Sequence, residues 1–292
     1  MATSKAKTDT KTNEKTDRVW LITGCSTGFG RQLAQAALAR GLRVVVTARN
    51  AAQVQDLAVR DRSLVLPLDV TKPDQVESVV KRAEATFGRV DVLVNNAGIG
   101  YFAAVEESEE AEVRKMFEIN FFGLARMIHA VLPGMRERRA GMIINMSSVG
   151  GLTSFPSLGY YNASKFAVEG LSEALAKEVA PLGIKVMLVE PSGFRTDWAG
   201  RSAQNGRVEI ADYATSTRPT QNEMRSASGR QAGDPARAAE AILSTAEMDS
   251  PPLHLLLGKD SVRFTREKLD DLRRDIDRWE ATSQAADFPV AS

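Results

Sequence analysis

Tyr161 and Lys165 stand four residues apart in the stretch 160–165, where a Pro/Gly-rich run gives way to a long helical pattern. Residues at this spacing share one face of a helix, so the phenol hydroxyl and the ammonium can converge on one ligand. A cation within ~4–6 Å favours the phenolate and lowers a tyrosine pKa by roughly 1–3 units from about 10. The pair therefore suggests proton transfer, although exposed helices also carry such pairs by chance.

A glycine-rich loop lies upstream, at Thr23–Gly30, between a predicted strand at 19–22 and a helical pattern that runs to Arg40. Glycines let a pyrophosphate approach the backbone, and a helix N-terminus offers unpaired N–H donors to an anion. The spacing is not Gly-x-Gly-x-x-Gly, and three glycines can also form a simple turn. The strand–loop–helix setting nevertheless predicts a dinucleotide site.

Arg49 follows the second predicted strand, at the place where NAD-binding folds put an acidic residue for the ribose hydroxyls. No acid is present in Thr47–Asn50, and a guanidinium suits a 2′-phosphate. The stretch predicts NADP as the cofactor, with NAD as the alternative if Arg49 is only a solvated residue at a strand end.

Apolar runs alternate with helical patterns across 18–260. The runs predict strands at 19–22, 44–46, 64–66, 92–94, 142–144, 186–189 and 253–257, and helical patterns fall at 29–40, 71–87, 108–119 and 121–138. Continuously apolar strands are typical of a parallel sheet buried on both faces. The alternation predicts an α/β fold, a Rossmann-type doubly wound parallel sheet of about seven strands in a single domain.

Three segments depart from this pattern. Residues 1–17 are polar and predict a disordered tail. Residues 192–233 are rich in Gly, Ser and Thr without clear periodicity, which is typical of a functional loop, here a substrate loop or lid. Residues 261–281 predict a charged amphipathic helix within a C-terminal segment, 261–292.

Composition excludes several classes of protein. The 38 basic and 37 acidic residues nearly cancel, so no field favours nucleic acid. One cysteine and two histidines make a His/Cys metal site improbable, and we expect no metal. No apolar run approaches the ~18 residues of a membrane span, and residues 1–17, which have no hydrophobic core, lead us to expect no signal peptide. We expect a cytoplasmic protein.

With these residues in place, the chain resembles the short-chain dehydrogenase/reductase family over about residues 18–258. The resemblance is carried by motifs in family order: Thr23–Gly30, Asn95–Gly98, Ser148 with Tyr161 and Lys165, and Pro191–Thr196. It looks most similar to the branch of estradiol 17β-dehydrogenase-like and retinol dehydrogenase-like enzymes. One departure follows the sixth strand, where the family commonly has Pro-Gly and this chain has Pro191-Ser192-Gly193.

The resemblance implies hydride transfer between a nicotinamide and a carbonyl or secondary alcohol. Tyr161 would be the general acid/base, and Lys165 would lower its pKa and bind the nicotinamide ribose. Ser148, thirteen residues before Tyr161, would hold the substrate oxygen. Asn120 would hold a water of a proton relay, and Asn95 would tie strands together.

The resemblance also implies a set of cofactor contacts. Besides Tyr161, Lys165 and Arg49, these residues are Gly24, Ser26, Thr27, Gly28, Phe29, Gly30, Asp69, Val70, Asn96, Ala97, Gly98, Phe194 and Thr196.

The implied substrate is a lipophilic ketone or alcohol, such as a steroid, a retinoid or an aromatic carbonyl, and the implied assembly is a homodimer or homotetramer. Two alternatives remain open. One is an NAD-dependent dehydrogenase of the same fold, and the other is a non-catalytic NADP-binding redox sensor.

Overall fold

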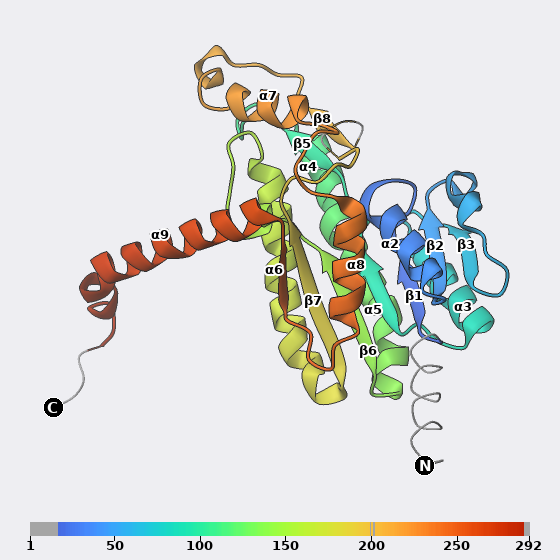
Figure 1. Ribbon diagram of the computed structural model, residues 1–292. Coiled ribbons are helices and arrows are strands. Elements are labelled where there is room, and N and C mark those ends of the chain that lie inside the picture. The colour runs from blue at the N-terminus through green and yellow to red at the C-terminus, as the bar shows by residue number, and fades with distance from the viewer. Residues whose placement is uncertain (1–16, 199, 201, 289–292) are drawn as a thin grey trace.

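The structure is a computed structural model that describes residues 17–198, 200 and 202–288. The predicted disordered tail lies outside these residues, except for Asp17. A seven-stranded parallel sheet forms the centre, in the order β3-β2-β1-β4-β6-β7-β9 (Figure 1). Its strands are β1 (Val19–Ile22), β2 (Arg43–Ala48), β3 (Ser63–Pro67), β4 (Val92–Asn95), β6 (Gly141–Met146), β7 (Ile184–Pro191) and β9 (His254–Leu257). All seven predicted strands are present, and the predicted fold class is confirmed.

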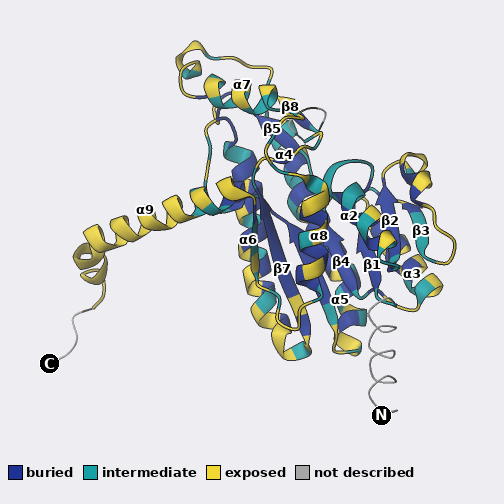
Figure 2. Cartoon of the chain, viewed as in Figure 1, coloured by how far each residue is buried: buried dark blue, intermediate teal, exposed yellow. Residues whose placement is uncertain are grey.

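Helices cover both faces of the sheet. Successive side chains of a strand point to opposite faces, so a continuously apolar strand has an apolar surface to bury on each side. Trp20 and Ile22 pack into one core with α2 (Gly28–Ala39) and α8 (Pro235–Ala246). Val19 and Leu21 pack into the other core, with α3 (Pro73–Phe87), α5 (Leu124–Glu137) and α6 (Gly159–Val179). Figure 2 shows the strands as the most deeply buried part of the chain.

The strand order reverses beside β1, which pairs with β2 on one side and β4 on the other. Ligands of doubly wound sheets bind at the carboxyl ends of the strands at such a point. The glycine-rich loop and Asn95–Gly98 both lie there, at the ends of β1 and β4.

The helices predicted for 108–119 and 121–138 form one continuous rod. A π-helical turn, Glu118–Gly123, joins α4 (Glu110–Phe117) directly to α5. A Cβ on Gly123 would stand 2.6 Å from a Val70 methyl, so the glycine lets the turn approach the loop after β3. Turns of this kind occur frequently at functional sites.

Segment 192–233 contains elements that its composition did not indicate. β8 (Ala203–Asn205) pairs in parallel with β5 (Gly100–Phe102), and α7 (Arg218–Ser226) follows. Together they form a small layer over the carboxyl end of the main sheet (Figure 1).

The helix predicted for 261–281 is α9, which runs from Lys259 to Gln284 and projects from the body (Figure 1). Within the described part of the chain, no helix has the length and apolar character needed to cross a membrane.

Candidate active site

The loop between β1 and α2 has a backbone that needs glycine. Gly24 and Gly28 have φ of +72° and +60°, the left-handed region that side chains disfavour. A Cβ on Gly30 would stand 2.5 Å from the Gly24 carbonyl oxygen. No side-chain hydrogen bond from Thr27 caps α2, and Ser26 and Thr27 are half-buried. The start of α2 thus keeps free amides at this loop, which suits a diphosphate.

Asn96 braces this loop from the neighbouring strand. Its Nδ2 donates to the carbonyls of Thr23 (2.8 Å) and Gly24 (3.0 Å). The Thr23 hydroxyl accepts from the backbone N–H groups of Asn96 (2.9 Å) and Ala97 (3.0 Å). Asn96 and Ala97 therefore fix the shape of the loop. The prediction for Asn95 is confirmed, because its Nδ2 donates to Asn145 Oδ1 on β6 at 2.9 Å.

Three further predicted cofactor residues lie at the ends of β2 and β3. Arg49 is exposed, and among the described residues none makes a hydrogen bond or ion pair with its guanidinium. Asp69 accepts from the N–H and hydroxyl of Thr71 at 3.0 and 2.8 Å, which holds the turn into α3. Val70 is buried beside Gly123.

Phe194 and Thr196 lie against the glycine-rich loop, although they are far from it in sequence. The rings of Phe29 and Phe194 have centroids 5.1 Å apart. A Cβ on Gly28 would stand 3.5 Å from the Thr196 Cβ. The segment that follows β7 therefore packs against the glycine-rich loop.

Ser192 is accommodated by a glycine. Its N–H donates to the Leu257 carbonyl at 3.0 Å, and a Cβ on Gly258 would stand 2.4 Å from its Oγ. Gly258 has φ of +94°, so its lack of a side chain permits both the turn and the contact.

Tyr161 and Lys165 lie on α6, and both are buried. Lys165 Nζ donates to the Met146 carbonyl at 2.8 Å and stands 5.8 Å from the centroid of the Tyr161 ring. The side chains share one helix face as predicted. The ammonium, however, lies over the face of the ring.

Burial controls the pKa values of both groups. It raises the pKa of Tyr161 to about 12, opposed by a hydrogen bond with Ser148. It lowers the pKa of Lys165 to about 8, opposed by Glu169. The expected lowering of the Tyr161 pKa is wrong for this structure, because desolvation of the phenolate outweighs the opposing hydrogen bond with Ser148. Tyr161 keeps its proton at neutral pH, as a proton donor must.

Ser148 is distinguished from its neighbour by its contacts. Its Oγ accepts from the Gly150 N–H at 3.0 Å, while the same side chain bonds to Tyr161. Ser147 points away and donates to Glu169 Oε1. The structure thus brings Ser148, Tyr161 and Lys165 together.

Asn120 lies in the π-helical turn and is buried. It exchanges two 2.9 Å hydrogen bonds with the backbone of Ile99, and its Nδ2 donates to Ser164 Oγ on α6 at 3.3 Å. It also approaches Gly98, where a Cβ would stand 3.3 Å from its Oδ1. Asn120 therefore connects the loop after β4 to the helix that carries Tyr161.

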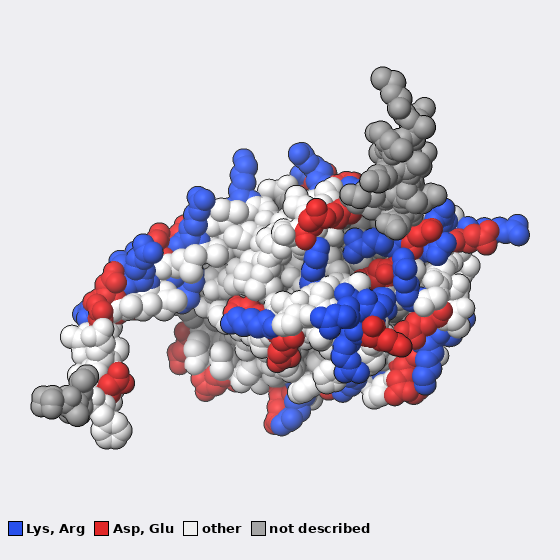
Figure 3. Space-filling model, turned by 90° about the horizontal axis from the view of Figure 1, so that it is seen from below, with Lys and Arg blue, Asp and Glu red and all other residues white. Residues whose placement is uncertain are grey.

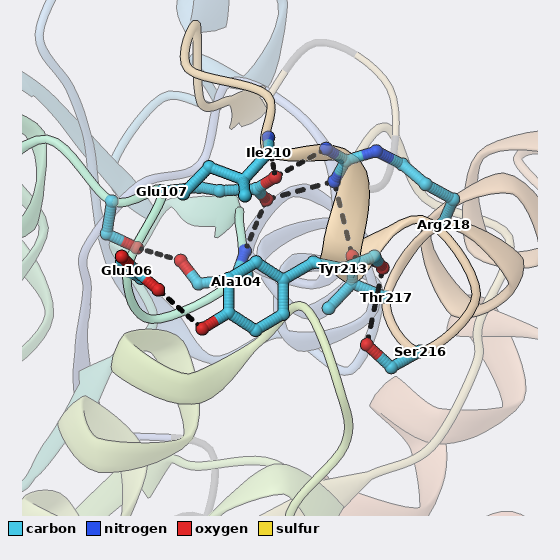
Figure 4. Close-up of polar contacts among 9 residues, drawn as sticks. Ala104, Glu106, Glu107, Ile210, Tyr213, Ser216, Thr217 and Arg218 are labelled. Carbon is cyan, nitrogen blue, oxygen red and sulfur yellow. Dashed lines mark hydrogen bonds and ion pairs between the residues drawn. The ribbon is translucent and has the colours of Figure 1, made fainter.

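Two groups near the site were not predicted from the sequence. The first fastens segment 192–233 to the loop before α4 (Figure 4). Buried Glu107 accepts from Arg218 at 2.6 and 3.0 Å and from the Ile210 N–H at 2.7 Å. The hydrogen bonds from Arg218 hold the pKa of Glu107 down, at about 2. Tyr213 donates to Glu106 Oε2 at 2.6 Å in the same place.

The second group lies one helical turn beyond Lys165. Glu169 and Glu190 are buried, and His254 Nδ1 lies 2.8 Å from Glu190 Oε1 and 3.7 Å from Glu169 Oε2. Burial raises the pKa of Glu169 to about 7 and that of Glu190 to about 9. Possible ligand atoms of the three residues lie within 4.8 Å of one another, a spacing that a cation could use. The three come from α6, β7 and β9, so spacing along the chain gives no signal of their meeting.

Comparison with known proteins gives a consistent result. A family model described as short chain dehydrogenase matches residues 18–206. Oxidoreductase BOA17 of Botryotinia fuckeliana is 37% identical over 272 residues, covering 92% of this chain and 99% of the relative. The 3-ketodihydrosphingosine reductase of Bacteroides thetaiotaomicron is 44% identical over 200 residues, covering 68% of this chain and 72% of the relative.

Solved structures agree. A short-chain dehydrogenase from Streptomyces avermitilis has a TM-score of 0.87 at 45% identity, covering 92% of this chain and 98% of the other. An enzyme from Burkholderia phymatum in complex with NAD has a TM-score of 0.78 at 26% identity, covering 88% and 95%. ElxO with NADP bound has a TM-score of 0.68 at 29% identity, covering 82% and 96%.

Proposed function

This chain belongs to the short-chain dehydrogenase family, and we propose that it is an NADP(H)-dependent carbonyl reductase or alcohol dehydrogenase with Tyr161 as general acid/base. One similar protein is named an oxidoreductase, and two similar solved structures hold NAD or NADP. The observation that carries the proposal is the buried Tyr161 phenol, hydrogen-bonded to Ser148 beside Lys165.

The chemistry that the cofactor supplies when bound is hydride transfer to or from carbon. In reduction, negative charge develops on the carbonyl oxygen, and the hydroxyls of Ser148 and Tyr161 are donors suited to stabilise it. Tyr161 then gives its proton to that oxygen. Lys165 keeps a cation near the phenolate that results, and Asn120 connects this helix to the loop after β4. In oxidation, the alcohol proton would pass to the Tyr161 phenolate as hydride leaves the carbon.

The cofactor would lie across the carboxyl ends of β1, β2 and β4. Gly24, Gly28 and Gly30 would take the diphosphate, and Phe194 and Thr196 would meet the nicotinamide end. Exposed Arg49 would bind the 2′-phosphate, because its guanidinium pairs with no described side chain. Binding of NAD in place of NADP is the alternative, and the similar structure from Burkholderia phymatum is in complex with NAD.

The substrate would be a lipophilic ketone or secondary alcohol. Trp198 stacks on Tyr161 with ring centroids 4.9 Å apart, and Phe102 packs behind Trp198 at 5.7 Å. Phe155 adds a further apolar wall. The name of one relative, 3-ketodihydrosphingosine reductase, describes a lipophilic ketone as substrate. The likeness to the estradiol and retinol dehydrogenase branch stays a prediction.

A homodimer or homotetramer in the cytoplasm completes the proposal. Phe122, in the π-helical turn, and Phe166, on α6, are 49% and 45% exposed, as expected of a surface that another subunit covers.

Absorbance of reduced nicotinamide, followed with NADPH and NADH against a panel of apolar and charged carbonyls, tests the proposal. We expect turnover of apolar ketones with NADPH. Turnover of small charged carbonyls only would overturn the proposed substrate class.

A further inference from the structure

The outer two-thirds of α9 carries large apolar side chains that are exposed to solvent. From Arg266 to Phe288 every residue is exposed, as the yellow outer part of the helix shows (Figure 2). Leu269, Leu272, Ile276 and Trp279 are 59%, 47%, 58% and 53% exposed. Most helical stability in proteins comes from tertiary packing of an amphipathic face, so a partner would stabilise this part of α9.

The base of the helix is anchored to the body. Ser261 Oγ donates to the Glu190 carbonyl at 2.7 Å, and the Phe264 ring packs edge-on against Phe155, with centroids 5.2 Å apart. The helix therefore leaves the body in a defined direction. Its 26 residues span about 39 Å at a rise of about 1.5 Å each.

The spacing of the exposed side chains is that of a coiled-coil seam. Leu269, Leu272, Ile276 and Trp279 alternate at intervals of three and four residues, which are the a and d positions of a heptad. Such a seam fits the seam of another helix.

The charges of α9 point to the kind of partner. Residues 259–284 contain seven basic and seven acidic side chains. Several pair within the helix, as Arg263 does with Asp260 and Glu267, and Arg274 with Asp271. A helix that lies on an anionic membrane needs a Lys/Arg-rich polar face, and nucleic acid needs a basic stripe. In Figure 3 both signs intermix along the projecting helix.

We propose that the projecting part of α9 packs antiparallel against α9 of a second copy of this chain. Leu269 would meet the partner's Trp279, and Leu272 the partner's Ile276, so all four exposed side chains become buried in each copy. This interface is separate from the surface of Phe122 and Phe166, and it does not depend on the proposed reaction.

Charge favours the antiparallel arrangement. A parallel pair would place Lys268 against the partner's Arg273 and Asp275 against the partner's Glu280, both like-charged. The antiparallel pair places Arg266 against the partner's Glu280 twice. Two like-charged contacts remain at the centre of the antiparallel pair, where Arg273 faces the partner's Arg273 and Asp275 faces the partner's Asp275.

The association is tested by sedimentation of the full-length chain over a range of concentrations. L272D/I276D is expected to lower the mass by one step of assembly, for example from tetramer to the remaining dimer. D270A/D277A, on the outer face of the same helix, is the matched control and should leave the mass unchanged. Equal masses of the unmodified chain and L272D/I276D at every concentration would overturn the proposal. So would binding of α9 to phosphatidylserine vesicles without self-association.

Charge reversal tests the orientation. E280R should weaken the association about tenfold and R266E should do the same, while the double variant R266E/E280R should restore it. In a parallel pair E280R would instead face the partner's Asp275 and tighten the association, which would contradict the antiparallel arrangement.

Discussion

The indole of Trp198 packs against the phenol of Tyr161, with ring centroids 4.9 Å apart and the planes tilted by 55°. Trp198 belongs to segment 192–233 and Tyr161 to α6, so the contact joins the covering segment to the proposed proton donor. Gly100 makes it possible, because a Cβ there would stand 2.7 Å from the indole. A substrate that reaches Tyr161 must therefore lie against Trp198 or displace it.

Replacing this indole should weaken the binding of apolar substrates. Trp198→Ala is expected to raise KM for an apolar ketone about tenfold or more, since about 1.5–3 kcal/mol accompanies burial of a large apolar side chain. The Kd of NADPH, measured by fluorescence titration, should stay the same. Tyr213→Phe, which changes the same segment only at its hydrogen bond to Glu106, is the control. An unchanged KM in Trp198→Ala would exclude Trp198 as a wall of the site.

Removing the phenol hydroxyl should separate chemistry from binding. Tyr161→Phe is expected to lower kcat by ~10²–10⁴-fold, the usual contribution of a positioned general acid. The ring remains to pack against Trp198, so cofactor affinity should change little. Tyr160→Phe, at the adjacent position, controls for the substitution. Near-normal turnover in Tyr161→Phe would refute the proposed mechanism.

Arg49 should decide the choice of cofactor. Arg49→Ala is expected to raise KM for NADPH by about tenfold or more, because a charge-assisted contact to phosphate is worth roughly 1.5–3 kcal/mol. KM for NADH should hardly change. Arg60→Ala is a suitable control, since Arg60 is an exposed arginine near the end of the β2–β3 connection. Equal effects on both cofactors would contradict the assignment to NADP.

The ion pair of Glu107 and Arg218 should hold segment 192–233 in place. The pKa of Glu107 is lowered from 4.5 to about 2, chiefly by Arg218. Its contribution to stability is complete above pH 4.5 and is lost as the pH falls towards about 2. Glu107→Gln should cost about 1–3 kcal/mol at neutral pH.

Hydrogen exchange of amides 203–218 measures this effect locally. The protection of these amides, corrected for the intrinsic exchange rate at each pH, should fall in Glu107→Gln at pH 7, and in the unmodified chain as the pH drops below 4.5. Glu106→Gln, which alters the neighbouring bond to Tyr213, is the comparison. If hydrogen exchange of amides 203–218 is the same in Glu107→Gln as in the unmodified chain, other contacts hold the segment.

Glu190 should make the fold sensitive to alkaline pH. Burial raises its pKa from 4.5 to about 9, so the folded chain keeps a proton that the unfolded chain releases. The contribution to stability is complete below pH 4.5 and is lost as the pH rises through about 9. The Glu169 carboxyl adds to this rise of the Glu190 pKa, and His254 Nδ1 lies 2.8 Å from Glu190 Oε1.

Chemical denaturation of Glu190→Gln at several pH values checks this expectation. The amide keeps the shape of the side chain and cannot ionise, so the decline in the free energy of unfolding between pH 6 and about 9 should become shallower. An identical decline in both chains would assign the sensitivity to another group.

Much of the fold follows from the sequence, because local pattern determines it. The strands are continuously apolar, and the glycine-rich loop requires left-handed backbone at Gly24 and Gly28. The meeting of Tyr161 and Lys165 follows from helix periodicity alone. These features depend on residues close together in the chain.

What the sequence did not reveal depends on distant residues or on burial. Glu107 and Arg218 are 111 residues apart and meet only through the small sheet of β5 and β8. The direction of the Tyr161 pKa shift was wrong because spacing gives the neighbouring cation and says nothing of desolvation. The sequence did not predict the elements of segment 192–233, because this segment packs against apolar residues elsewhere in the chain, as Trp198 does against Phe102.

The contact between Ser192 and Gly258 makes the effect of a substitution at one position depend on the residue at the other. With serine at 192, a side chain at 258 meets its hydroxyl at 2.4 Å. With glycine at 192 that obstacle disappears, and only the left-handed backbone at 258 opposes the change. A chimera that exchanges the segment after β7 with that of a relative should therefore exchange residue 258 as well. If Ser192 is combined with a larger residue at 258, the two side chains clash.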